Sequence, residues 1–180
     1  MGATILKKSI TFNLTGTALC VALGLVLPLL FHALGAGPIF LPMHIPVLLC
    51  GLLFGWQFGA VCGLAVPILS SVFTSMPPIF PTAVAMMFEL CTYGVLTGVF
   101  HRKLHWNIYS ALIFAMLGGR LVSGIANAVL MGVSGKPYGI QAFVTSAFVE
   151  SLPGIILQIV LVPFLVLALE KTKIFRKENA

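Results

Sequence analysis

The chain has 180 residues, of which 59% are hydrophobic and only 8% are charged, and its net charge is +6. A soluble domain carries about 25% charged residues, so the composition predicts an integral membrane protein and excludes a second, soluble domain. The positive charge does not indicate nucleic-acid binding, because most of the basic residues form short clusters beside apolar segments, a pattern that sets the orientation of membrane proteins.

The apolar segments predict an all-α, polytopic membrane protein, organised as a single integral membrane domain over residues 1–180. The first segment is longer than the roughly 7–15 residues of a signal-peptide core, so we expect a retained helix. The run over 39–73 would be about 50 Å long as one helix, and we divide it at the tight turn 55–59. Prolines at 77, 78 and 81 exclude a continuous helix over 74–81. The predicted spans are about 9–30, 43–56, 58–74, 82–100, 108–131 and 142–169, with kinks at Pro153 and Pro163 in the last.

Six transmembrane helices place both termini on the same side. The N-terminus, the connection 101–107 and the C-terminal tail carry the basic clusters, whereas the opposite side holds only Lys136. We therefore predict a multi-pass protein of the cell membrane with cytoplasmic termini. The loops expected outside are longer and nearly uncharged, and each pairs a proline with an aromatic residue, as in Pro137-Tyr138. They either cover an outward-facing pocket or form ordinary interfacial turns.

Three charged side chains lie inside otherwise apolar spans: Glu89, Arg120 and Glu150. An ionisable group in hydrocarbon costs about 2.5 kcal/mol or more, so such residues usually line a site or a path. At about 1.5 Å per residue, Glu89 lies about 10 Å from the outer end of its span, Arg120 about 16 Å, Asn127 about 6 Å and Glu150 about 12 Å. This convergence of three helices predicts a site for a polar small molecule that enters from outside, with His44 and Tyr138 from the outer loops as further binding candidates.

Other interpretations of these residues stay open. Arg120 and one glutamate could form a purely structural ion pair, which would leave the second carboxylate protonated or bound to a ligand donor. Two close carboxylates could also perform acid–base catalysis, but no nucleophile or metal-binding motif supports an enzyme, and we expect no cofactor and no metal. His44 could instead be a solvated interfacial residue. The four cysteines lie within spans without a CxxC pair and are interpreted as packing residues.

The sequence contains no phosphate-binding loop, so active transport would need an ion gradient or a partner. Six short helices, a length of 180 residues, cytoplasmic termini and the small pair Ala18 and Ala22 in the first helix resemble the substrate-binding S components of energy-coupling-factor (ECF) vitamin transporters. The segments 40–46, 76–78 and 86–90 look like the pantothenate-like branch of that family.

The resemblance implies that the chain captures a water-soluble vitamin under its outer loops and then topples in the membrane to release it inside. It also implies a transmembrane T component, which packs on Ala18 and Ala22, and two ATPase subunits. Arg120 could meet the carboxylate of pantothenate, our first candidate. A formal site charge of −1, from Arg120 with two glutamates, instead favours pyridoxine or hydroxymethylpyrimidine. A stand-alone ion-coupled carrier and an intramembrane enzyme using Glu89 and Glu150 are the alternative functions.

Overall fold

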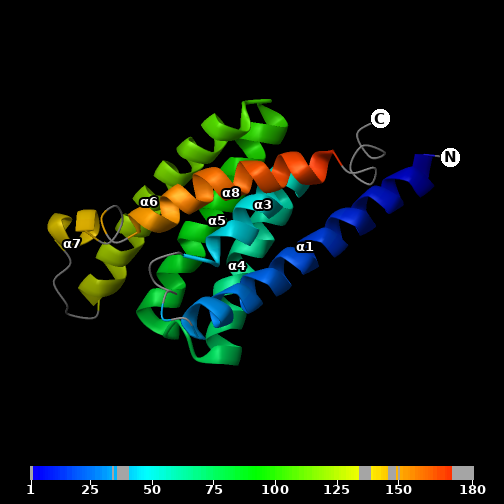
Figure 1. Cartoon of the computed structure of the whole chain (residues 1–180). Helices are drawn as coiled ribbons and strands as arrows, with labels where there is room; N and C mark the ends of the chain where they lie inside the picture. Colours follow the sequence, from blue (N-terminus) through cyan, green and yellow to red (C-terminus); the bar gives the residue numbers. More distant parts are fainter. Residues whose placement is uncertain are drawn as a thin grey trace.

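A computed structural model of the chain is helical throughout the part that it describes (Figure 1). The described residues are 2–33, 35, 41–133, 139–145, 149 and 151–171, without the side chains of 2–9, 32, 33, 140 and 142. The elements are α1 Gly2–Ala33, α3 His44–Phe54, α4 Trp56–Thr74, η1 Ile79–Ala83, α5 Val84–Gly98, η2 Val99–Lys103, α6 Ile108–Val133, α7 Ile140–Val144 and α8 Leu152–Glu170.

Five helical segments are long and apolar enough to cross a membrane: 10–31, 56–74, 79–103, 108–133 and 152–170. They correspond to five of the six predicted spans. The remaining one, α3, has 11 residues and is about 16 Å long, well short of a hydrocarbon core of about 30 Å. Every residue of α3 is buried, as expected for a helix that is apolar on all sides. The predicted span 43–56 is therefore a short core helix.

Two predicted boundaries were wrong. The turn expected over 55–59 is the single residue Gly55, whose φ of 99° is accessible to glycine, and α4 already begins at Trp56. The last predicted span, 142–169, is not one helix, because α7 ends at Val144 and α8 begins at Leu152 after the non-helical Ser151. Pro153 therefore lies in the first turn of α8, where a missing N–H costs nothing, and does not kink a longer helix.

Close backbone approach joins α3, α4 and α5. A Cβ on Gly94 of α5 would overlap the backbone of Gly59 on α4, and a Cβ on Gly51 of α3 would overlap the Gly94 carbonyl group and the Thr97 hydroxyl. Only glycine allows helices to approach this closely. The glycines therefore hold these three helices together as one tightly packed unit.

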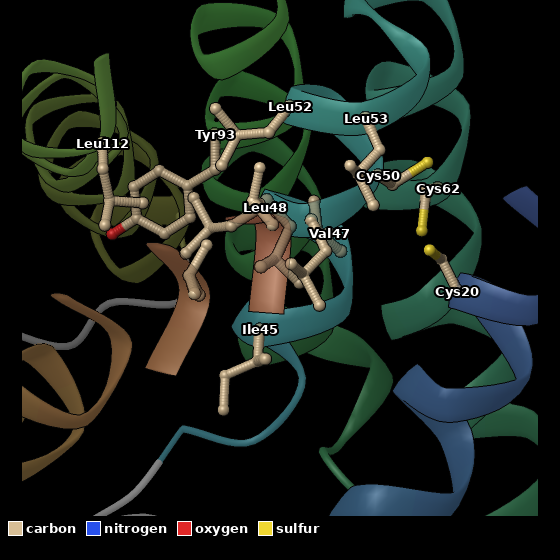
Figure 2. Close-up of a cluster of buried hydrophobic side chains, with 14 of the residues drawn as sticks. Cys20, Ile45, Val47, Leu48, Cys50, Leu52, Leu53, Cys62, Tyr93 and Leu112 are labelled. Carbon is tan, nitrogen blue, oxygen red and sulfur yellow. The ribbon is translucent and has the colours of Figure 1, made fainter. Parts of the chain in front are cut away.

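The apolar core centres on α3, which contacts α1, α4, α5 and α8. Figure 2 shows Cys20 of α1, Cys50 of α3 and Cys62 of α4 with their sulfur atoms directed toward one another. All three are buried free thiols, and Cys50 donates a hydrogen bond to the Thr17 hydroxyl across 3.7 Å. The interpretation of the cysteines as packing residues is confirmed for these three, whereas Cys91 is only partly buried. Among the described residues, no group of histidine, cysteine or acidic side chains could hold a metal ion.

Helix α1 packs on α3 and α4 of this unit, and α8 packs on α3. Figure 1 shows that α1 begins and α8 ends at the same end of the bundle, and that α3 and α8 run in the same direction. The first turn of α3 therefore lies at the opposite end from the start of α1. Which side of the membrane each end faces stays a prediction.

Candidate functional site

A buried carboxylate forms the centre of a polar cluster between α3, α5 and α6. Glu89 on α5 is only 4% exposed. Its Oε1 accepts a hydrogen bond of 2.9 Å from the Tyr93 hydroxyl, one turn further along the same helix face. The same oxygen lies 3.1 Å from Nη1 of Arg120 on α6. Glu89 is therefore both paired and hydrogen-bonded, as a buried charge must be.

Arg120 reaches Glu89 because its neighbour is small. A Cβ on Gly119 would overlap the Tyr93 ring, so the glycine lets α6 approach α5 at this level. Arg120 is 8% exposed, and a guanidinium has five N–H donors. Its Nη1 faces Glu89, but its Nε and Nη2 are buried without a hydrogen-bond partner among the described residues.

His44 extends the cluster from the first turn of α3. Its ring is 1% exposed and lies 5.4 Å from the Tyr93 ring, measured between centroids. The Nε2 atom is 3.5 Å from Oε1 of Glu89, a charged contact only if the ring is protonated. Neither ring nitrogen has a hydrogen-bond partner within the described residues, although Nε2 lies near this carboxylate oxygen. The interpretation of His44 as a solvated interfacial residue is wrong, because the side chain is buried.

Sequence reasoning missed Gln158. This glutamine of α8 has no exposed surface, and neither Nε2 nor Oε1 has a hydrogen-bond partner in the described part of the chain. The signal was present, since Gln158 is the only amide in the apolar segment 152–169. A buried amide without partners costs about 1–3 kcal/mol. In the sequence, however, an uncharged side chain in an apolar segment is a weaker signal than a charged one.

The remaining predicted residues differ in position. Asn127 is partly buried, and its amide donates to the Ser123 carbonyl group of its own helix over 2.9 Å. Tyr138 and Glu150 lie outside the described residues. Ala18 and Ala22 are both exposed on α1.

The polar cluster contains hydrogen-bond donors that no acceptor within it uses. Arg120 and Glu89 balance in charge, so the formal charge of −1 expected from the sequence depends wholly on Glu150. Among the described residues, the unpartnered buried atoms of this cluster belong to His44 and Arg120, and Gln158 of α8 has further ones. Several precisely placed polar groups within an apolar surrounding are typical of a small-molecule site.

The comparisons with known proteins also indicate a protein that binds a small molecule. Neither the curated proteins nor the solved structures include a match to the chain. One family model does match, that of the ECF transporter substrate-specific component, over residues 12–166. This range includes Glu89, Tyr93, Arg120 and His44, three of the five helical segments that could cross a membrane, and most of the other two. The chain therefore belongs to the family of substrate-specific components of ECF transporters.

Proposed function

We propose that the chain captures a water-soluble vitamin, with pantothenate as the first candidate, at the outer face of a bacterial plasma membrane. Delivery to the cytoplasm would be driven by two partner ATPases acting through a transmembrane T component. Family membership supports the role of a substrate-specific subunit. The vitamin, the direction and the partners are our inference, and we assign no enzymatic activity to the chain.

The observation that carries this proposal is the set of unused donors on Arg120. Its Nε and Nη2 are buried without a partner among the described residues, while Nη1 is held by Glu89. Glu89 therefore fixes the guanidinium in place and leaves one edge of it free. A planar edge with two N–H donors matches a carboxylate, and His44, whose ring nitrogens are also unpartnered, would add a further donor. A purely structural ion pair does not explain why these donors are left unused.

The carboxylate argument favours pantothenate over pyridoxine and hydroxymethylpyrimidine. Within the described cluster Arg120 and Glu89 cancel, so an anionic group could bind without facing an uncompensated negative charge. Glu150, Asn127 and Tyr138 stay candidates for binding the rest of the molecule. Pyridoxine and hydroxymethylpyrimidine would be favoured if Glu150 adds a second carboxylate to the site.

The test is a binding measurement on the chain purified in detergent. Mass spectrometry identifies any small molecule that co-purifies, and calorimetry then measures affinity for pantothenate, for its neutral alcohol pantothenol and for pyridoxine. We expect Arg120→Lys, which keeps the charge but removes the planar edge, to weaken pantothenate binding about 10- to 100-fold. Lys103→Gln is the matched control, because Lys103 is exposed and distant in the sequence from the cluster. Wild-type affinity in Arg120→Lys would contradict the proposed role of Arg120.

Reconstitution separates this function from that of a self-sufficient carrier. Liposomes that contain the chain alone should bind labelled pantothenate but should not accumulate it under an ion gradient. Gradient-driven accumulation without any other protein would support an ion-coupled carrier and would overturn the dependence on partner ATPases.

A further inference from the structure

We propose that Gln158 of α8 binds the substrate directly and recognises an uncharged polar group on it, either an amide or a hydroxyl. This inference rests on the proposed function and assigns to the same site a specificity-determining residue. It begins from an unsatisfied side chain. Gln158 is completely buried, and both ends of its amide lack a hydrogen-bond partner within the described residues.

The position of Gln158 follows from the packing of α8 on α3. The two helices are in contact and run in the same direction (Figure 1). On α8, Gln158, Val162 and Val166 are fully buried at intervals of four residues, and the buried Gly154 precedes them at the same spacing. On α3, where every residue is buried, one row at this spacing is His44, Leu48 and Leu52.

In each row one polar residue is followed by two aliphatic ones. Residues four apart lie on one face of a helix, and two parallel helices that pack along such rows keep their order. The aliphatic residues of both rows belong to the same apolar core. We infer that the two polar residues share the other end of the interface, which brings Gln158 to the part of the bundle where His44 approaches Glu89.

The chemistry of the unpartnered atoms defines the group that would bind. A primary amide offers donors on nitrogen and an acceptor on oxygen, so its complement must supply both, as another amide or a hydroxyl does. Arg120 and His44 supply donors for an acceptor such as a carboxylate. The combined site therefore suits a small acid that also carries an amide or a hydroxyl. Pantothenate has both, and pantothenol lacks only the acid.

The experiment compares stability with affinity. Replacing a binding residue should weaken the ligand without lowering the thermal midpoint, whereas replacing a structural residue should lower the thermal midpoint. Gln158→Leu removes an unsatisfied buried amide and keeps a side chain of similar size. We expect an unchanged or higher thermal midpoint for the ligand-free chain in detergent, together with binding about 10- to 100-fold weaker. Val162→Ala is the matched control one turn along the same row. It should lower the thermal midpoint by leaving a cavity and leave the affinity unchanged.

Comparing pantothenate, pantothenol and pyridoxine shows which group of the ligand Gln158 contacts. Gln158→Leu should weaken pantothenate and pantothenol by the same factor, because both retain the amide and hydroxyls. Arg120→Lys should weaken pantothenate much more than pantothenol. If Gln158→Leu keeps wild-type affinity, or lowers the thermal midpoint as Val162→Ala does, Gln158 is not a binding residue. If the wild-type chain binds pyridoxine alone, the choice of pantothenate is wrong, and Gln158→Leu must then weaken pyridoxine. A wild-type chain that binds none of the three would refute the proposed vitamin and this contact together.

Discussion

Among the described residues, Glu89 carries the only carboxylate beside Arg120. The stability of the cluster therefore depends on Glu89. Glu89→Gln leaves the guanidinium buried without a counter-charge. Removing one partner of a buried ion pair costs about 3–5 kcal/mol. We expect a loss of this size in the free energy of unfolding, measured by denaturant titration in detergent.

Tyr93→Phe is the control for this prediction at the residue scale. It removes the hydroxyl that donates to Glu89 across 2.9 Å but leaves the ion pair in place, so about 0.5–1.5 kcal/mol should be lost. The double variant Glu89→Gln with Arg120→Gln should cost less than the sum of the two single changes, because residues in contact are coupled. Additive costs would show that the two side chains do not pair in the membrane protein.

At the scale of the element, the glycine contacts determine how closely α4 and α5 pack. Gly94→Ala would place a methyl group against the backbone of Gly59, where no side chain can move aside. We expect the helices to separate and the free energy of unfolding to fall by about 1–3 kcal/mol. Gly132→Ala in α6 is the control, since its Cβ would meet nothing within 4 Å. That change should be neutral or stabilising by up to about 1 kcal/mol. Equal thermal midpoints for the two variants would contradict the close approach.

At the scale of the whole molecule, we propose that α1 presents a surface for assembly. Ala18 and Ala22 are both exposed, whereas Thr17, Cys20 and Gly24 on the same helix face the bundle. Small exposed residues four apart let a partner helix approach. We expect Ala18→Trp to leave folding and vitamin binding intact and to abolish co-purification with the T component and the ATPases.

Leu23→Trp controls for the added bulk. Leu23 is also exposed on α1 but lies about a quarter of a turn or more to the side of the alanine pair. Assembly should survive this change. If Ala18→Trp assembled and transported as the wild type does, the proposed partner surface would be wrong.

Much of the fold was predictable because each apolar segment carries its own signal. Five predicted spans correspond to helices long enough to cross a membrane, since the bilayer sets the length of an apolar helix. The errors occurred where local signals are ambiguous. Gly55 alone forms the turn that was predicted as five residues, and α8 begins at Leu152 within a segment predicted to be one helix. An apolar run does not reveal a break as short as the single residue Gly55.

The candidate site was predictable only in part. A charge within an apolar segment is visible in the sequence, so Glu89 and Arg120 were found as candidates. Gln158 was missed, because a single amide in α8 gains its significance from total burial without a partner. Asn127 was grouped with the charged residues by depth, yet its amide bonds to its own helix. Depth along a helix gives the height of a side chain but not its direction.

The sequence by itself therefore determined that the chain is a helical membrane protein with ionisable groups at similar depth, because burial in lipid constrains the composition of every span. Tertiary structure alone decided that Glu89 pairs with Arg120, that His44 is buried beside them and that Gln158 has no hydrogen-bond partner among the described residues. The reason is physical. Hydropathy acts within a single helix, whereas a binding site depends on how several helices are rotated and packed against one another.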